Sequence, residues 1–175
     1  MNNCYVFFVQ TGSENNVCRY LNENLSENNQ YTFSPKKEIV YRKARKVSIH
    51  LKNMFPGYVF TKTDYAPLVF IKIVSSLTRQ TGKIIRLLGM YNPDSMNLSL
   101  NEKEFLMKLC DDQFVVKKSI GLIIGDRVIV REGPLVGLES IIKKVDRHNH
   151  RAEIELPFMG ELRQISLSLE IVSKM

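Results

Sequence analysis

Positively charged side chains are concentrated in one short stretch of the sequence. Residues 34–52 carry a net charge of +6, whereas the whole chain of 175 residues carries +7. Glu38 is the acidic residue of this stretch, and its basic residues are Lys36, Lys37, Arg42, Lys43, Arg45, Lys46 and Lys52. Cationic density of this kind favours a polyanionic partner. A solvated basic loop is the alternative interpretation.

A second group of basic residues surrounds one predicted turn, although residues 121–175 sum to zero net charge. The group comprises Lys143, Lys144, Arg147, His148, His150 and Arg151. Lys and Arg side chains neutralise the phosphates of a nucleic acid, and a loop that also carries His and Asn can reach base edges or stack on bases. We therefore expect RNA binding at this turn, with a solvated hairpin as the alternative.

Residue types suited to catalysis or to metal binding show no such grouping. His148 and His150 lack an acidic or Cys partner at ligand spacing, so the sequence predicts no metal site and no cofactor. No acid, base and nucleophile converge, which argues against an enzyme. Cys4, Cys18 and Cys110 have no paired spacing and favour a reducing compartment. Without a leader segment or an apolar window near the ~20 residues of a membrane span, we expect a soluble, cytoplasmic protein.

An aromatic corner follows the basic stretch, at Phe55-Pro56-Gly57-Tyr58. Pro56 fixes its own φ at about −65° and pushes Phe55 toward an extended conformation, while Gly57 permits a turn that a side chain would obstruct. From Gly57 onward, alternation predicts a strand with one buried face and one face able to present aromatic side chains. A turn followed by an ordinary core strand is the alternative.

The elements that position these residues are predicted from hydrophobic periodicity. Residues 1–110 read as strand, helix, strands, helix, strand, helix, which indicates an α+β sandwich. Residues 78–82 are expected to form a loop. The expected strands are 5–9, 31–33, 39–41, 47–51, 58–61 and 84–88, with 39–41 and 47–51 in a long, mobile basic hairpin. The expected helices are 14–25 after a Ser13 cap, 64–77 after an Asp64 cap, and one that begins at a Ser99–Glu102 capping box.

The pattern changes beyond residue 120. Residues 111–120 have mixed charge without helical periodicity and are expected to link two units. Beyond Gly121, short alternating runs separated by turn residues predict a small barrel of five strands. β-branched residues and turn glycines dominate these runs, so we expect a permanent β-structure. The runs are 127–131, 138–145, 151–156, 162–167 and 171–172.

The run from Gly125 to Leu135, followed by Gly137, resembles a KOW module, and the whole chain resembles the NusG family. In that resemblance, residues 1–110 match the N-terminal NusG (NGN) domain through strand 5–10, the aromatic corner and the helix start at 99–104. Residues 111–120 are the linker, and residues 121–175 match the SH3-like KOW barrel. The basic arm, the opening 8–14 and the excess positive charge resemble the LoaP-like group of specialised paralogues.

The resemblance implies a function in transcription. The NGN domain of the family binds the clamp helices of the largest catalytic subunit of RNA polymerase, and the matching positions here are Phe8, Phe55 and Tyr58. Arg79 and Thr81 lie in a flanking loop in relatives. Rigid aromatic anchors suit such a helix-in-groove contact. The expected protein is a monomeric processive antiterminator that suppresses pausing and termination in selected long operons, recruited by a nascent RNA hairpin or alternatively by non-template DNA.

Other members of the family suggest alternatives. A general NusG factor couples polymerase to the ribosome or to a termination factor, and the loop that matches Phe158 and Met159 docks a ribosomal small-subunit protein or a termination factor there. Exposed apolar tips suggest such a partner, unless both side chains close the end of the barrel. A ribosome-associated KOW protein is the third possibility, but it would not need residues 1–110. RfaH-like members refold the KOW module into a helical hairpin.

Overall fold

The computed structural model describes residues 2–25, 30–43 and 46–174, and the helices and strands given below are those of these residues. Contacts within the chain divide it into two compact units. The first unit comprises Met1–Ser34 and Phe55–Lys103, and the second comprises Pro35–Met54 and Glu104–Met175. None of the helices in the described ranges has both the length and the apolar composition needed to cross a membrane.

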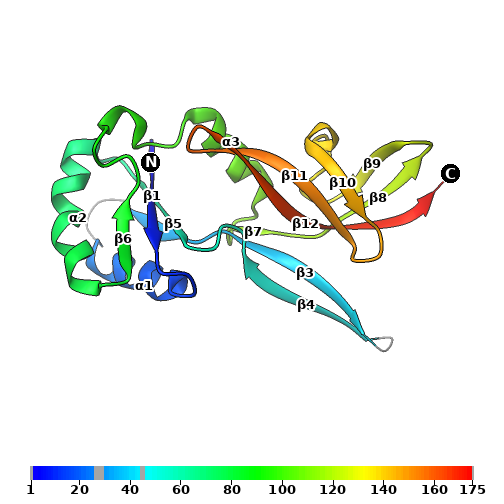
Figure 1. Cartoon of the computed structure of the whole chain (residues 1–175), viewed down its shortest axis with the longest axis horizontal. Helices are drawn as coiled ribbons and strands as arrows, with labels where there is room; N and C mark the ends of the chain where they lie inside the picture. The colour runs from blue at the N-terminus through cyan, green and yellow to red at the C-terminus, as the bar shows by residue number, and fades with distance from the viewer. Residues whose placement is uncertain (1, 26–29, 44–45, 175) are drawn as a thin grey trace. The chain divides into compact units, whose positions relative to one another are not determined.

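An antiparallel sheet forms the centre of the first unit (Figure 1). Its strand order is β2-β5-β1-β6, and every neighbouring pair is antiparallel. The predicted α+β class, with an antiparallel sheet flanked by helices, is confirmed. The strands are β1 (Asn3–Val9), β2 (Tyr31–Phe33), β5 (Tyr58–Thr63) and β6 (Ile84–Leu87). The helices are α1 (Glu14–Asn24), α2 (Pro67–Thr81), the 3-10 helix η1 (Pro93–Ser95) and α3 (Leu100–Leu109), which begins in this unit.

Alternation along β1 decides which side chains enter the core of the first unit. Tyr5, Phe7 and Val9 belong to one buried cluster with side chains of both helices, and Phe8 between them points to the opposite face. The rings of Tyr5 and Phe70 stack with centroids 4.4 Å apart. Full burial of one such large apolar side chain contributes about 1.5–3 kcal/mol. The partners from the helices are Val17 and Leu21 of α1 and Phe70 and Val74 of α2.

Both predicted boundaries of α2 were wrong. The helix continues through the expected loop 78–82 as far as Thr81 and ends at Gly82, whose φ of 60° is left-handed. Glycine is the usual residue at such an end because it has no Cβ to strain. Asp64 does not cap the helix, since Pro67 occupies its first turn. Proline suits that position because the missing N–H would have had no partner there.

The predicted capping box of α3 is confirmed. The backbone N–H of Ser99 donates to Oε2 of Glu102 (2.8 Å), and the N–H of Glu102 donates to Oγ of Ser99 (3.3 Å). Two N–H groups that the first turn would leave unpaired are thereby satisfied. At α1, Ser13 occupies the cap position, but its side chain makes no capping hydrogen bond.

A two-stranded hairpin in the second unit confirms the predicted basic hairpin. It consists of β3 (Lys36–Lys43) and β4 (Lys46–Asn53), paired from Lys36 opposite Asn53 to Lys43 opposite Lys46. The start of β3 also pairs in parallel with β7 (Val115–Val116). The expected linker 111–120 therefore contains a strand. Local sequence did not reveal it because its partner strand lies far away in the chain.

The second sheet of the second unit has the order β10-β11-β12-β8-β9. It confirms the predicted number of five strands in this part of the chain, but several of the predicted bounds were wrong. The run 138–145 begins as a 3-10 helix and becomes a strand only at Ile142. The runs 162–167 and 171–172 are parts of one strand, and an unpredicted strand begins at Ser119. The strands are β8 (Ser119–Ile124), β9 (Arg127–Glu132), β10 (Ile142–Asp146), β11 (Arg151–Phe158) and β12 (Glu161–Lys174), with the 3-10 helix η2 (Glu139–Ile141) before β10.

Candidate functional site

The structure brings Phe8 and Tyr58 together on one face of the first sheet. They lie directly opposite each other in β1 and β5, and their ring centroids are 5.4 Å apart. Both side chains are half-buried. On the other side of β1, Arg86 of β6 lies opposite Phe8 with its guanidinium carbon 5.9 Å from the ring centroid. The sequence pointed to both aromatic residues, but it missed Arg86 because the register between β1 and β6 was unknown.

Phe55 differs from the exposed anchor that the sequence suggested. Its side chain is 4% exposed, and its ring centroid lies 5.5 Å from that of Phe60, which is fully buried. The backbone N–H of Tyr58 donates to the carbonyl of Phe55 (3.1 Å), which closes the turn between them. The turn directs Phe55 inward and leaves Tyr58 half-exposed. Phe55 therefore packs on the inner side of the aromatic corner, and Phe8 and Tyr58 are the rings left partly exposed beside it.

A buried carboxylate holds the turn in place. Glu14 is 1% exposed, and its Oε1 accepts a hydrogen bond from the N–H of Gly57 (2.7 Å), while its Oε2 accepts one from the N–H of Gly12 (2.8 Å). Hydrogen bonds to an ionised acceptor are among the stronger ones in proteins. The sequence had assigned Glu14 only to the first turn of a helix. Its contact with Gly57 spans 43 positions, so no local pattern could reveal it.

Gly57 has no room for a side chain. Its φ is +83°, and an added Cβ would lie 3.2 Å from Oγ1 of Thr11 and 3.3 Å from the ring of Phe8. Its carbonyl also accepts the N–H of Val9 (2.8 Å). The backbone at Gly57 thus packs directly against the ring that faces Tyr58.

Arg79 and Thr81 lie in the last turn of α2, not in a loop. Nε of Arg79 donates to the carbonyl of Ser75 (3.1 Å) in the same helix. Thr81 lines a hollow of about 310 Å³ together with residues of α1, among them Tyr20. Since α1 and α2 pack on the opposite face of the sheet from Phe8, the structure does not bring these two residues into the aromatic corner.

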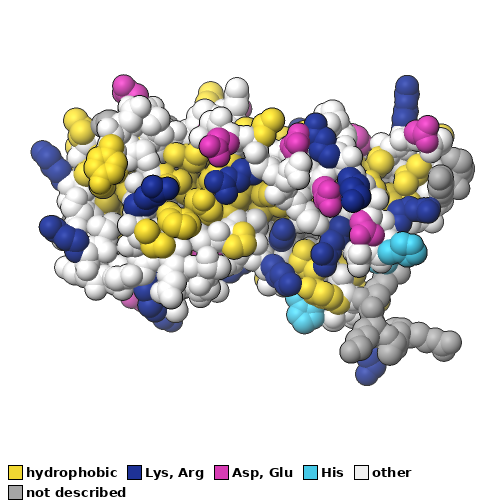
Figure 2. Space-filling model, in the orientation of Figure 1, with side chains coloured by type: hydrophobic (Ala, Val, Ile, Leu, Met, Phe, Trp, Pro, Cys, Tyr) yellow, Lys and Arg dark blue, Asp and Glu magenta, His cyan; other side chains and the backbone are white. Residues whose placement is uncertain are grey.

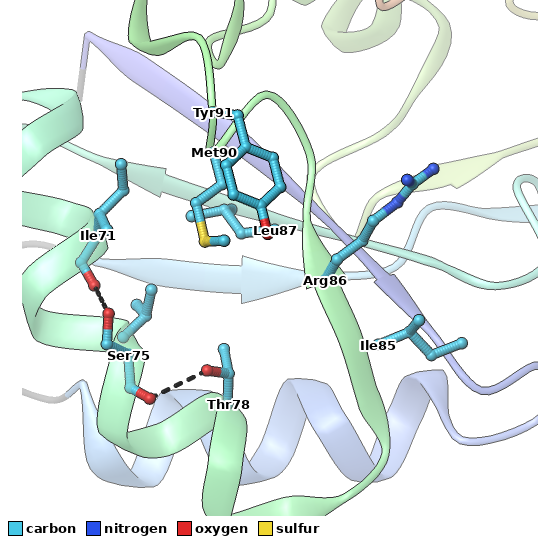
Figure 3. Close-up of a pocket in the computed structure, with 9 residues that line it drawn as sticks. Ile71, Ser75, Thr78, Ile85, Arg86, Leu87, Met90 and Tyr91 are labelled. Atoms are coloured by element: carbon cyan, nitrogen blue, oxygen red, sulfur yellow. Dashed lines mark hydrogen bonds between the residues drawn. The ribbon is translucent and has the colours of Figure 1, made fainter.

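A mostly apolar hollow of about 380 Å³ lies between α2 and β6 (Figure 3). Figure 3 shows that Arg86 directs its guanidinium away from Ser75 and Thr78 of the helix. Tyr91 at its rim is 94% exposed. Ile85, Arg86 and Leu87 of β6 line the hollow, while the guanidinium carbon of Arg86 lies 5.9 Å from the centroid of the Phe8 ring. The lining residues are Ile71, Val74, Ser75, Thr78, Ile85, Arg86, Leu87, Met90 and Tyr91.

The basic hairpin presents its cations unevenly. Figure 2 shows Lys and Arg side chains gathered with a His side chain over the hairpin. Lys46 and Lys52 are exposed, whereas Lys36 and Lys37 are half-buried. Nζ of Lys36 donates to Oδ1 of Asn53 (2.7 Å). Among the other residues predicted to bind RNA here, Arg42 and Lys43 are described by their backbones in β3, and Arg45 lies outside the described residues.

The predicted RNA-binding turn joins β10 to β11. Lys144, Arg147 and His148 are exposed there, whereas His150 and Arg151 are half-buried. Lys143 forms an ion pair with Glu155 (3.0 Å), so its charge is partly compensated. The turn itself is stabilised by Asp146, whose carboxylate accepts hydrogen bonds from the backbone N–H (3.0 Å) and side-chain amide (2.7 Å) of Asn149. These interactions lower the pKa of Asp146, and the hydrogen bond from the side chain of Asn149 is the largest cause.

Phe158 does not form an exposed tip. It is 2% exposed, and the guanidinium carbon of Arg163 lies 4.9 Å from its ring centroid. Met159 is half-buried and has a φ of 53°. The expectation of an exposed apolar pair was therefore wrong for Phe158, which instead closes the end of the sheet between β11 and β12. In the described part of the chain, no three His, Cys, Asp or Glu side chains are grouped as metal ligands would be.

Comparison with known proteins identifies similar chains. The family model described as "Transcription termination factor nusG" matches residues 2–106. The curated protein "Transcription termination/antitermination protein NusG" of Helicobacter pylori strain J99 is 24% identical over 97% of each chain, and that of strain 26695 is 23% identical over 97% of each. The solved structure titled "Domain interaction in Thermotoga maritima NusG" is 15% identical, covers 97% of this chain and 93% of its own, and superposes with a TM-score of 0.47.

Proposed function

The chain belongs to the NusG family of transcription termination and antitermination factors, and from this membership we propose that it is a processive antiterminator. It would bind elongating RNA polymerase and suppress pausing and termination in selected long operons. The proposed division is a polymerase-binding NGN domain at 1–110, a linker at 111–120 and a KOW domain at 121–175. On this proposal the protein is a binding factor without catalytic chemistry of its own.

The aromatic corner is the proposed contact for the clamp helices of the polymerase. The observation that carries this proposal is the pair of half-exposed rings, Phe8 and Tyr58, on a turn that Glu14 and Gly57 hold rigid. Rigid aromatic side chains lose little conformational entropy when they bind, which suits them as anchors. Arg86 adds a cation at the edge of the same surface. Arg79 and Thr81, on α2, are secondary candidates for the same partner.

RNA is the proposed signal that recruits the protein to its operons. A specialised paralogue that shares its polymerase site with a general factor needs a further contact to select its targets. The exposed cations Lys144 and Arg147, together with His148, support a contact with nascent RNA. Non-template DNA is the rival ligand, because phosphate contacts alone do not distinguish it from RNA.

Coupling to the ribosome or to a termination factor is the second candidate function. It depends on the turn between β11 and β12 as a docking loop. The burial of Phe158 removes one of the two expected docking side chains and leaves half-buried Met159, with Leu162, 71% exposed, beside the same turn. This arrangement gives the coupling function less support than the antiterminator function.

A pull-down with the clamp region of RNA polymerase tests the proposed contact. We expect Tyr58→Ala to weaken binding by more than about 2 kcal/mol, as truncation of an interface anchor does, and to lower terminator read-through in a purified transcription assay. Leu68→Ala removes an apolar side chain that is 64% exposed on α2, and should leave both measurements unchanged. Wild-type binding by folded Tyr58→Ala protein would exclude the aromatic corner as the polymerase contact.

A further inference from the structure

The hairpin is attached to the sheet of the second unit by polar contacts at its base. Nζ of Lys37 donates to the carbonyl of Ser166 in β12 (2.8 Å). Oγ of Ser168 donates to the carbonyl of Glu38 (2.7 Å), and the Glu38 carboxylate accepts the N–H of Lys118 (2.8 Å). The hairpin and β12 belong to the same compact unit. The base of the hairpin therefore has a defined position against β12.

One face of the hairpin carries cationic and aromatic side chains. Lys37 lies opposite Lys52 in the antiparallel register, and Tyr41 lies opposite Ser48, so alternation puts all four on the same face. The Nζ of Lys52 is 5.5 Å from the centroid of the Tyr41 ring, which His50 meets edge-on at 5.1 Å. Since Lys37 reaches β12 from this face, the group adjoins the five-stranded sheet.

Arg151 contributes a further cation from the sheet. It pairs with Ser168 across β11 and β12, and Ser168 is the residue that contacts the hairpin backbone. Nε of Arg151 is buried and has no hydrogen-bond partner among the described residues. The guanidinium of Arg151 and the ammonium of Lys52 both lower the pKa of Tyr41, and a hydrogen bond from Lys52 is the largest cause.

Within the described residues, the cations of this group have no carboxylate partner. No carboxylate of the described residues lies within 4.0 Å of the cationic nitrogens of Lys37, Lys52 or Arg151. Burial lowers the pKa of Lys37 most, and the neighbouring charges of Arg151 and Lys52 lower it further. Like charges held together in this way repel one another, and a bound anion would relieve that repulsion.

We propose that Lys52 and Tyr41 of the hairpin and Arg151 of β11 form one composite site for single-stranded nucleic acid. The cations hold a phosphodiester, and the Tyr41 ring, 37% exposed, stacks on an adjacent base. The inference rests on the proposed function, because it takes nucleic acid as the ligand. It goes further in joining the two basic stretches into one site that neither forms alone.

Titration of the full chain with fluorescent single-stranded 12-mers, oligouridylate and oligothymidylate, tests the composite site. Lys52→Gln and Arg151→Gln should each weaken binding about tenfold, as the loss of a charge-assisted hydrogen bond does. In a plot of the logarithm of the binding constant against the logarithm of the salt concentration, each variant should also reduce the steepness of the slope by about 0.7. Because both cations hold the same phosphate, the double variant should lose less than the product of the single effects. Multiplicative losses would show two independent contacts and overturn the proposal.

The stacking role of the Tyr41 ring is tested by comparing a leucine and a phenylalanine variant. Tyr41→Leu should weaken binding about 5- to 100-fold, the range found for loss of base stacking, whereas Tyr41→Phe should retain the affinity. Equal affinities of the Leu and Phe variants would overturn the stacking contact. Lys72→Gln, which removes an exposed lysine of α2, is the matched control and should stay within about twofold of the unmodified chain. Unfolding curves identify any variant that fails to fold, and Arg151→Lys then replaces Arg151→Gln as the probe that keeps a charge but loses the guanidinium.

The outcomes separate this inference from the proposed function. If Lys144→Gln and Arg147→Gln weaken binding of leader RNA while Lys52→Gln and Arg151→Gln leave both 12-mers bound normally, the composite site is excluded and RNA recruitment stands. If the unmodified chain binds neither 12-mer at low salt nor leader RNA, both fail. Tighter binding of oligouridylate than of oligothymidylate assigns the site to RNA, and the reverse order assigns it to the displaced DNA strand.

Discussion

Two glycines near the aromatic corner share a partner but differ in their surroundings. The N–H groups of Gly12 and Gly57 both donate to the carboxylate of Glu14, and their φ values are +88° and +83°. A Cβ at Gly12 would meet nothing within 4 Å, whereas one at Gly57 would approach Thr11 and Phe8. The pair therefore separates backbone strain from steric crowding.

We expect Gly57→Ala to destabilise the chain more than Gly12→Ala. Both variants lose about 1–2 kcal/mol because alanine disfavours a left-handed φ. Gly57→Ala should lose a further ~1–3 kcal/mol because the new methyl group overpacks against the Phe8 ring. Free energies of unfolding from urea titration measure the difference, and equal losses for the two variants would contradict crowding at Gly57.

Single residues were predictable from sequence where their environment is set locally. Tyr58 follows from the strand alternation predicted after Gly57, whereas Phe8 was indicated by the resemblance to the NusG family. The burial of Phe55 depends on contacts with Phe60, and the role of Glu14 depends on a turn remote in sequence. Arg86 joins the aromatic corner only through the register of β6 against β1. Such tertiary contacts leave no periodic signal in the chain.

At the scale of elements, the turn before β7 is organised by one carboxylate. Oδ1 of Asp111 accepts the N–H groups of Gln113 and Val115, each at 2.9 Å, and Oδ2 pairs with Lys117 (3.3 Å). The bond from Val115 is the largest of the causes that lower the pKa of Asp111. Since Val115 begins the strand that pairs with β3, Asp111 orders the edge of the three-stranded sheet.

Asp111→Ala should destabilise the chain by about 1–2 kcal/mol at neutral pH, because backbone donors lose a charged acceptor. A carboxyl whose pKa is lowered by folding stabilises the folded state above its unfolded pKa and loses that contribution as the pH falls through the folded pKa. The difference from the unmodified chain should therefore shrink on acidification below the ordinary Asp pKa of 3.8.

Unfolding monitored by circular dichroism across this pH range checks the prediction. Asp112→Ala removes the neighbouring exposed carboxylate and serves as the control, with little expected change at any pH. A loss that is the same at acid and neutral pH would show that Asp111 acts through packing and not through its charge.

Elements were predictable to the extent that local periodicity defines them. The helices, the hairpin and most strands were found, because each buries one face with a regular spacing. The end of α2 was missed, since Thr78 to Thr81 are compatible with both helix and loop until Gly82 terminates the helix. β7 and the length of β12 were missed because both depend on distant partner strands.

At the scale of the whole molecule, recruitment by RNA predicts a specific salt dependence. Lys144→Ala and Arg147→Ala should each flatten the log–log salt slope for leader RNA by about 0.7 to 0.9 per lost phosphate contact. Lys143, also predicted to bind RNA, gives a comparison within β10 through Lys143→Ala. Its ammonium is already paired with Glu155, so it should change the slope less. Titrations at several salt concentrations measure all three slopes.

Selectivity completes the test of recruitment. Leader hairpin should bind more tightly than scrambled RNA and non-template DNA, because hairpin shape and 2′-hydroxyl groups can be read in addition to charge. Equal affinity for the three ligands at each salt concentration would exclude an RNA signal. A general elongation factor would then be the better description.

Strand β12 also constrains the order in which the second unit can form. Its first part pairs with β11 as a hairpin, from Glu161 opposite Phe158 to Ser168 opposite Arg151, and its second part pairs in parallel with β8. Hairpins close quickly, whereas the parallel pairing must first close the long loop between Ser119 and Leu169. During synthesis, β3, β4, β8 and β9 therefore leave the ribosome before the strand that unites them. Until β12 has been synthesised, β8 lacks its parallel neighbour and the base of the basic hairpin lacks its contacts with β12. During that interval a chaperone or another unpaired strand can bind these exposed groups.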